Sequence, residues 1–398
     1  MGFAGGERRV LIRGARVLTM GGPARRGEAT GELGVLDGAD VLLEGGRVLA
    51  LGQGLAKEAP EVVQAEGRVL LPAFVDAHTH ACWAGSRLAE WERKLAGASY
   101  LELMAEGGGI MATVRATRAA SVAELRTLLE GRLAAMHALG TGAAEVKSGY
   151  GLDTEAELRM LEAIASARHP APLRMTACIG HAKDATVPEF VERTIERTLP
   201  AVSAAFPQAT VDAYCEEGAW SLEETQRLTA AARAAGHEVR LHVDQFHDLG
   251  AVDALLPLGV RSFDHLEAST PATLRRLAES EAFGVMLPSS GFHLDDRYAD
   301  GRAFLDAGGR LALGTNLNPG SAPGPSMPFV LALAVRKLGL SPAEAIYAAT
   351  RQAAELLDLP DRGRIEVGAS ADLLLLSARD ERELAWAFGA PLLQRRFA

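Results

Sequence analysis

The middle of the chain alternates short apolar segments with longer alanine- and leucine-rich segments, and this alternation constrains the fold more than any other feature. Helices are expected between the apolar segments, for example at 121–139 and 221–235, where Ser121 and Ser221 each precede a glutamate by three residues, as helix N-caps do. Strand and helix repeated eight times predict an α/β fold, a parallel (β/α)8 barrel of the TIM type. An open doubly wound sheet is the alternative, but no Gly-x-Gly-x-x-Gly motif follows an early strand. The eight predicted strands are 71–77, 141–147, 173–179, 210–215, 238–243, 260–264, 283–288 and 310–315.

The two ends of the chain have a different pattern, in which polar and apolar residues alternate as they do in half-buried strands. Strands are predicted at 9–18, 61–70 and 372–376, and a hairpin that turns at a glycine pair is predicted at 39–51. We therefore expect the two ends to meet in one small domain. The expected division is a β-sandwich domain formed by 1–70 together with 359–398, and a barrel domain at 71–358.

Charge and cysteine content narrow the choice of partners. The chain carries 41 Lys and Arg against 51 Asp and Glu, a net charge of −10, so neither a nucleic acid nor an anionic membrane is expected as partner. Small anionic ligands remain possible, because local arginines can offset a negative total. Cys82, Cys178 and Cys215 are spaced neither as a disulfide framework nor as a zinc knuckle, which favours a reducing cytoplasm. We expect no signal peptide and no membrane span, because no apolar run is long enough.

Five of the ten histidines follow predicted strands, at the end where a barrel of this type places its catalytic groups. His78 and His80 follow the first strand at positions i and i+2, which share one face of an extended chain, so both can reach one ion. His181, His242 and His265 follow the third, fifth and sixth strands, and this recurrence predicts a metal site at the rim. Of the other five, three are expected to be solvated in or after helices and two to lie in loops near the site: His137, His169 and His237, and then His247 and His293.

These histidines stand in longer motifs that point to a family. Four segments, 76–118, 145–161, 241–251 and 318–328, resemble those of the imidazolonepropionase family within the amidohydrolase superfamily; they include DAHTHACWAGSR, EVKSGYGLD, LHVDQFHDLGA and NPGSAPGPSMP. The resemblance covers the barrel nearly end to end. It implies a hydrolase that opens the cyclic amide of 4-imidazolone-5-propanoate to N-formimidoyl-L-glutamate in histidine degradation. It also implies one zinc ion, with iron as the alternative, and a homodimer.

The resemblance further implies roles for individual residues. His265 matches a histidine that hydrogen-bonds to the substrate or to the attacking water, and Arg87 matches an arginine that grips the substrate carboxylate. A glycine triplet at 107–109 also matches and predicts either an ordinary turn or a loop that closes over the substrate. The metal ligands match His78, His80 and His242. The remaining substrate contacts match Tyr150, His181, Gln245, Asn318, Gly320 and Ser321.

One position departs from the family pattern. The eighth strand of the family ends in an aspartate that touches the metal and takes a proton from the attacking water, and the matching residue here is Asn316. A carboxamide cannot accept that proton, and it is a weaker ligand. An introduced substitution that stalls turnover would explain Asn316, and so would a natural variant that uses another base.

Three other functions remain open at this point. A purine or pyrimidine deaminase of the same superfamily would share the metal ligands, although the motifs around Arg87 and Tyr150 favour the imidazolone. A binuclear cyclic amidase needs a carboxylated lysine on the fourth strand, whereas Lys147 falls on the second. A non-catalytic binding protein that kept the pocket and lost the base would fit Asn316.

Overall fold

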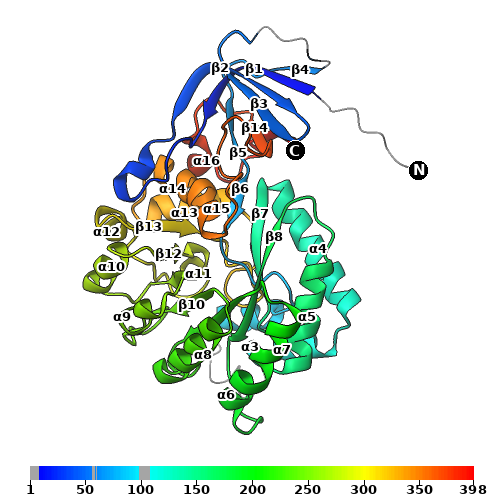
Figure 1. The fold of residues 1–398 in the computed structure, drawn as a ribbon, viewed down its shortest axis with the longest axis vertical. Coiled ribbons are helices and arrows are strands. Elements are labelled where there is room, and N and C mark those ends of the chain that lie inside the picture. The colour runs from blue at the N-terminus through cyan, green and yellow to red at the C-terminus, as the bar shows by residue number, and fades with distance from the viewer. Residues whose placement is uncertain (1–8, 56–58, 60, 98–107) are drawn as a thin grey trace.

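The computed structural model describes residues 9–55, 59, 61–97 and 108–398, and its larger part is a barrel of eight parallel strands (Figure 1). The strands follow one another around the sheet in chain order, and each neighbouring pair is parallel. This order confirms the predicted barrel and excludes the doubly wound sheet, in which the strand order reverses. The strands are β6 Phe74–Asp76, β7 Thr141–Lys147, β8 Leu173–Gly180, β9 Thr210–Cys215, β10 Val239–Val243, β11 Ser262–His265, β12 Phe283–Met286 and β13 Arg310–Leu313.

The first predicted strand, 71–77, is divided between two sheets. Residues Val69–Pro72 form β5, which pairs with the terminal strands, and the barrel strand β6 begins only at Phe74. The change of sheet occurs at Ala73, because the Ala73 amide donates to Asp372 and the next amide, that of Phe74, donates to Gly140. A continuous apolar run gives no sign of such a division, so the prediction of one strand was wrong here.

The barrel is nearly closed by contacts between its first and last strands. The Asp76 carboxylate at the end of β6 accepts hydrogen bonds from the Thr315 amide at 2.9 Å and the Thr315 hydroxyl at 2.6 Å. The Asn316 amide then donates to the carbonyl of His78 at 3.0 Å. These bonds hold the segments after β6 and β13 side by side, so that residues far apart in the sequence share the rim.

Helices cover the outside of the barrel, as Figure 1 shows for α4, α5 and α8. The helices predicted at 121–139 and 221–235 are confirmed as α4 and α8, and both begin with a capping box in which Ser121 or Ser221 exchanges hydrogen bonds with a glutamate. The helices are α1 Leu88–Leu95, α3 Ile110–Ala119, α4 Val122–Ala138, α5 Thr154–Ser166, α6 Phe190–Arg193, α7 Leu199–Ala205, α8 Leu222–Ala234, α9 Ala251–Leu255, α10 Pro271–Ala278, α11 Pro288–His293, α12 Gly301–Asp306, α13 Met327–Lys337, α14 Pro342–Tyr347, α15 Ala353–Leu356 and α16 Glu383–Trp386.

One histidine after a helix is not solvated as expected. His237 follows α8 and is only 2% exposed. Its Nδ1 lies 2.7 Å from the Ala209 carbonyl oxygen, and its Nε2 lies 2.8 Å from the Ser203 hydroxyl of α7. The short connection from α8 to β10 places this ring against α7. The helical pattern of the sequence does not reveal such a contact between separate segments. His137 and His169 are half-buried.

Both chain ends meet in a separate sheet of seven strands, drawn at the top of Figure 1. The predicted hairpin is β2–β3, and it turns at Gly45 and Gly46, both with positive φ. The core of this sheet joins residues from both ends, for example Ile12 and Leu375. We propose a small domain of 1–70 and 359–398 around this core, with the barrel domain at 71–358. The strands besides β5 are β1 Arg9–Leu18, β2 Val35–Glu44, β3 Arg47–Gly52, β4 Glu61–Gln64, β14 Leu373–Leu376 and β15 Leu393–Phe397.

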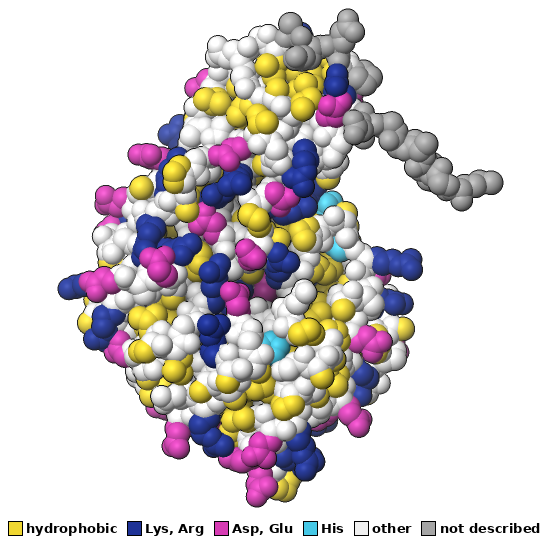
Figure 2. All heavy atoms as spheres, viewed as in Figure 1, with side chains coloured by type: hydrophobic (Ala, Val, Ile, Leu, Met, Phe, Trp, Pro, Cys, Tyr) yellow, Lys and Arg dark blue, Asp and Glu magenta, His cyan; other side chains and the backbone are white. Residues whose placement is uncertain are grey.

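The surface of the barrel carries charges of both signs. On the face seen in Figure 2, Lys and Arg side chains are interspersed with Asp and Glu rather than gathered in a field of one sign. None of the helices in the described part of the chain combines the length and the apolar character that a membrane span requires.

Candidate active site

Three histidine side chains converge at the carboxyl ends of β6 and β10. His80 Nε2 lies 3.2 Å from His78 Nε2 and 3.0 Å from His242 Nε2. All three rings are buried. Their ligand atoms lie within 4.8 Å of one another, so that one ion can contact all three rings.

The partners of the other ring nitrogens prepare His78 and His242 for a metal ion, whereas His80 Nδ1 has no hydrogen-bond partner among the described residues. His78 Nδ1 donates to Asp264 at 2.6 Å and His242 Nδ1 donates to Asp212 at 3.0 Å, so each ring keeps its Nε2 as a lone pair. Burial, followed by the charge of Lys147, lowers the pKa of His78 and of His242 well below the usual value, and both rings are neutral. Lone pairs this close repel one another unless a cation lies between them. The donor set therefore fits a metal ion.

A buried ionic network lies beneath the histidines, and the sequence analysis did not anticipate it. Lys147 Nζ lies 2.6 Å from Glu145 and 2.7 Å from Asp212, and Arg240 Nη2 lies 2.7 Å from Asp264. None of these five residues is more than 2% exposed. Three carboxylates against two cations leave one net negative charge, which favours a cation among the histidines.

A second group of potential ligands shares His242 and adds Cys178 and Asp212. The Asp212 carboxylate already accepts hydrogen bonds from His242 Nδ1 and Lys147 Nζ. Burial raises the pKa of the Cys178 thiol well above its usual value, which keeps the sulfur protonated and makes it a poor ligand. The three histidines are therefore the better candidate.

Asn316 and His265 reach the same region from strand ends with left-handed backbone. Their φ angles are 54° and 89°, and Leu266 follows at 72°, a strained geometry typical of functional sites. Asn316 Nδ2 donates to the Ser290 hydroxyl at 2.7 Å, whereas its Oδ1 is buried without a hydrogen-bond partner among the described residues. His265 Nδ1 lies 3.1 Å from the Glu267 carboxylate, an arrangement that leaves Nε2 as an acceptor.

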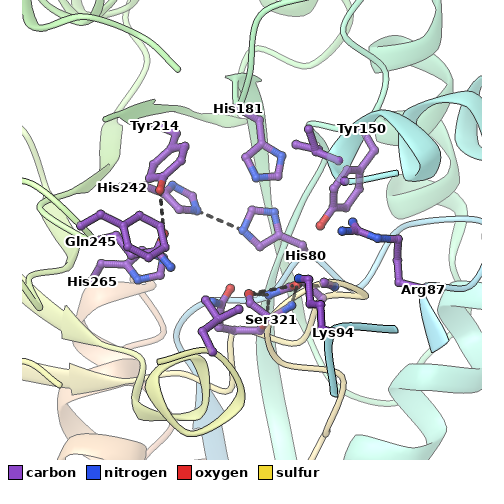
Figure 3. A pocket seen from close by; sticks show the side chains of 17 residues that line it. His80, Arg87, Lys94, Tyr150, His181, Tyr214, His242, Gln245, His265 and Ser321 are labelled. Atoms are coloured by element: carbon purple, nitrogen blue, oxygen red, sulfur yellow. Dashed lines mark hydrogen bonds between the residues drawn. The ribbon is translucent and has the colours of Figure 1, made fainter. Parts of the chain in front are cut away.

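These groups open onto a cavity of about 290 Å³ (Figure 3). In this view Arg87 and Tyr150 lie on one side of the cavity and Gln245 and His265 on the other, with His80 between them. The cavity is lined by His80, Arg87, Lys94, Gly109, Ile110, Tyr150, His181, Tyr214, His242, Gln245, Phe246, His265, Leu294, Asn316, Asn318, Gly320 and Ser321.

Arg87 and Lys94 supply positive charge to this cavity. Arg87 precedes α1, and its Nε donates to Glu90 at 2.7 Å, while its Nη2 is also bonded to that carboxylate. A Cβ atom added at Gly320 would lie 3.3 Å from Arg87 Nη1. The glycine therefore leaves space beside the guanidinium, where a ligand carboxylate can approach.

Tyr150 and His181 form a wall beside His80. The rings of His80 and His181 are stacked, with centroids 4.6 Å apart, and the Tyr150 ring lies 5.1 Å from that of His181. His181 Nδ1 donates to the carbonyl of Gly149 at 3.0 Å, and burial lowers the pKa of His181 to about 4. A neutral ring with Nε2 unprotonated can accept a hydrogen bond from a ligand. Gly149 has φ 110°, which a residue with a side chain rarely adopts.

Gln245 is held by a tyrosine that the sequence analysis overlooked. The Tyr214 hydroxyl of β9 donates to Gln245 Oε1 at 2.8 Å, so Gln245 keeps its amide nitrogen as a donor. The following loop is tied to Glu216, which accepts from the Phe246 amide at 2.8 Å and pairs with His247 Nδ1 at 2.7 Å. His247 itself is exposed and turned to this carboxylate.

The segment after β13 forms a tight turn around Asn318. The Asn318 side-chain oxygen accepts from the Gly320 and Ser321 amides, each at 2.8 Å, and its nitrogen donates to the Asn316 carbonyl at 2.7 Å. Both ends of this amide are therefore used within the turn. What the turn offers to a ligand is the stretch at Gly320 and Ser321, on the cavity wall.

Comparison with known proteins identifies the family. Residues 69–391 match the model of the Amidohydrolase family. The chain is 45% identical over 366 residues to imidazolonepropionase of Deinococcus radiodurans, covering 92% of each chain. It is 44% identical over 382 residues to imidazolonepropionase of Herpetosiphon aurantiacus, covering 92% of this chain and 90% of that one. The chain belongs to the imidazolonepropionase family of amidohydrolases. This confirms the resemblance inferred from the motifs.

Solved structures of more distant amidohydrolases share the fold. N-isopropylammelide isopropylaminohydrolase from Burkholderia multivorans superposes with a TM-score of 0.71 at 19% identity, over 98% of this chain and 97% of that one. Atrazine chlorohydrolase from Arthrobacter aurescens, complexed with zinc, gives 0.68 at 18% identity, over 94% and 91%. At such identities the likeness concerns the fold alone.

The site residues expected from the imidazolonepropionase motifs are brought together, with His78 just behind the cavity wall. Of the glycine triplet, Gly107 lies outside the described residues, while Gly109 lines the cavity. His293 stacks on Trp91, with ring centroids 6.2 Å apart. The sequence analysis assigned no role in the site to Glu90, Lys94, Tyr214 or the residues of the ionic network. The one sequence signal of that network was the presence of charged residues inside apolar strands.

Proposed function

We propose that the protein hydrolyses the cyclic amide of 4-imidazolone-5-propanoate to N-formimidoyl-L-glutamate, a C–N bond cleavage in histidine degradation. The observation that carries this proposal is the single cavity lined by all seven residues expected to contact the substrate. Membership of the imidazolonepropionase family supports the same reaction. A purine or pyrimidine deaminase is not favoured, because Arg87 gives this cavity a carboxylate site that a nucleobase does not need.

His78, His80 and His242 would hold one zinc ion, or iron in its place. Asn316 Oδ1, which has no hydrogen-bond partner in the described part of the chain, is available as a further donor. When bound, such an ion would polarise the ring carbonyl and lower the pKa of water. Asp264 and Asp212 fix the tautomers that leave Nε2 free, which is the usual task of carboxylates behind metal-binding histidines.

The cavity residues bind and orient the substrate. The free edge of the Arg87 guanidinium donates to the propanoate, since the other edge is held by Glu90. His181 Nε2 accepts from a ring N–H, and the Gln245 amide nitrogen donates to an acceptor on the ring. Gly320 and Ser321 contact the opened product. Together these contacts fix the ring against the histidines.

His265 is the remaining candidate for proton transfer. Its Nδ1 is paired with Glu267, so Nε2 can accept a proton from the attacking water and return it to the leaving ring nitrogen. Asn316 can do neither, because a carboxamide has no basic site. With Asn316 in place of an aspartate, proton transfer depends on His265 alone, and turnover is therefore expected to be slow.

The test is to compare the protein with Asn316→Asp, both loaded with the same metal, in turnover of 4-imidazolone-5-propanoate. We expect the aspartate variant to be faster by about 10²–10⁴-fold, the usual worth of a positioned general base. Gln208→Glu makes the same change from carboxamide to carboxylate at an exposed residue outside the cavity, and it serves as the control, without a gain in rate. Equal rates for Asn316→Asp and the unchanged protein would assign the proton to His265. No turnover by either, with binding retained, would indicate a non-catalytic binding protein.

We further propose a homodimer in the cytoplasm. The three cysteines are free and buried, in keeping with a reducing compartment, and the family resemblance supports the dimer. Light scattering of the purified protein tests the oligomeric state directly.

A further inference from the structure

Glu90 is a half-buried carboxylate beside the cavity that no step of the proposed reaction uses. It lies on α1, with its side chain 11% exposed, and it contacts groups from three directions. Arg87 donates to it through Nε and Nη2, the Gly109 amide donates to it at 2.9 Å, and Lys94 Nζ lies 3.6 Å away. Arg87, Gly109 and Lys94 all line the cavity, whereas Glu90 lies behind them.

We propose that Glu90 is a positioning residue, which holds the Arg87 guanidinium in the one orientation that presents its free edge to the substrate carboxylate. This inference rests on the proposed function, since it requires that Arg87 binds a carboxylate. It makes Glu90 a determinant of specificity for substrates that carry an acid side chain.

The planar Arg87 guanidinium is fixed in orientation by its pairing with Glu90. Glu90 occupies the edge formed by Nε and Nη2, and both hydrogen bonds that Arg87 makes among the described residues go to this carboxylate. The edge containing Nη1 faces the space beside Gly320, where an added Cβ would lie 3.3 Å away. A bidentate pair fixes the plane as well as the distance, so the free edge has one direction.

The charges of Arg87, Lys94 and Glu90 also favour a ligand with one carboxylate. Arg87 and Lys94 contribute two positive charges and Glu90 one negative charge, so the group keeps one net positive charge toward the cavity. Burial alone would raise the pKa of Glu90, but the hydrogen bonds from Arg87 and Gly109 lower it, and the carboxylate stays ionised. One net positive charge suits a ligand with one carboxylate.

A purely structural role is the alternative, because Glu90 also ties α1 to the start of α3. Gly109 is the residue before α3, and its amide donates to Glu90 at 2.9 Å. A structural defect would weaken the binding of every ligand of the cavity. A positioning defect would weaken the binding only of ligands that carry a carboxylate, and this effect would disappear when Arg87 is absent.

The experiment measures binding by calorimetry with imidazole-4-propanoate, which lacks the ring carbonyl and is not hydrolysed, and with the matching carboxamide. The variants are Glu90→Gln, Arg87→Ala and the double variant, each checked for an unchanged unfolding temperature. Glu92→Gln, exposed on the same helix, is the matched control. Turnover of 4-imidazolone-5-propanoate provides a second readout.

We expect Glu90→Gln to bind the propanoate about tenfold more weakly, in the range of one hydrogen bond to a charged group, and to bind the carboxamide unchanged. Loss of a negative charge alone would strengthen anion binding, so weaker binding isolates the loss of orientation. In the Arg87→Ala background the same change should cause no further loss of affinity. In turnover, KM should rise about tenfold while kcat stays within about twofold.

Equal or tighter binding of the propanoate by Glu90→Gln would overturn the inference, and so would an equal loss for both ligands or a further loss in the double variant. The proposed function fails in a different way. It fails if the unchanged protein does not prefer the propanoate over the carboxamide, since no carboxylate site then exists for Glu90 to serve.

Discussion

Replacing Asp264 by asparagine tests how the ionic network supports the histidines. Asp264 accepts from His78 Nδ1 at 2.6 Å, from Arg240 Nη2 at 2.7 Å and from the Ser262 hydroxyl at 2.5 Å. Asparagine fits the same space, but it carries no charge, and its NH₂ group would face groups that are themselves donors. We expect the variant to bind zinc more weakly and to be less stable.

The magnitudes follow from what the carboxylate contacts. Removing a carboxylate behind a metal-binding histidine typically costs about 10–100-fold in metal affinity, or about 1.4–2.7 kcal/mol. The net charge of the network also changes from −1 to zero, in the same unfavourable direction for a cation. Arg240 is left with Glu145 at 3.4 Å, and breaking one partner of a buried ion pair costs about 3–5 kcal/mol of folding free energy.

Competition against a chelator of known affinity measures the zinc dissociation constant, and thermal unfolding with and without zinc measures stability. Asp380→Asn is the control. Asp380 pairs with Arg382 on the surface, so this substitution removes the same charge far from the histidines. The reasoning would be refuted if Asp264→Asn bound zinc within about twofold of the unchanged protein, or if the control lost as much affinity.

Two further predictions concern single contacts. Arg87→Ala should weaken binding of the propanoate by about 1.5–3 kcal/mol, the worth of a hydrogen bond to a charged group, and Arg87→Lys should restore only part of it, because a lysine cannot make a bidentate contact; unchanged affinity in a calorimetric titration would show that another group holds the carboxylate. Ser121→Ala should lower the free energy of unfolding by about 1 kcal/mol through loss of the α4 cap and leave KM unchanged, and an unfolding curve equal to that of the unchanged protein would contradict the capping contribution.

The barrel and most of its elements could be predicted from the sequence because the signals are local. Alternating apolar and helical segments, and a serine three residues before a glutamate, report on backbone geometry within a few residues. The convergence of His78, His80 and His242 was also predictable, because the fold places all strand ends at one rim and the i, i+2 pair shares a face. The family motifs added the substrate contacts.

Other features depended on which distant segments meet. Strand β15 carries Gln394, Arg395 and Arg396 and has little apolar pattern of its own, but it pairs with β14 once the two chain ends come together. The division of 71–77 between two sheets depends on two distant carbonyls, because Asp372 accepts from the Ala73 amide and Gly140 from the Phe74 amide. A local pattern contains no information on such pairings.

The interior of the barrel shows the same limit at the site itself. Lys147, Asp212 and Asp264 stand on three different strands, and each alone would be an unfavourable charge in an apolar segment. Only the stagger of the nearly closed sheet brings Lys147 Nζ to 2.7 Å from Asp212 and 4.0 Å from Asp264 beneath the histidines, where the charges offset one another. The sequence determined which residues reach the rim, because strand ends are set locally. The tertiary structure decided which of them touch, because that depends on the register between strands distant in the chain.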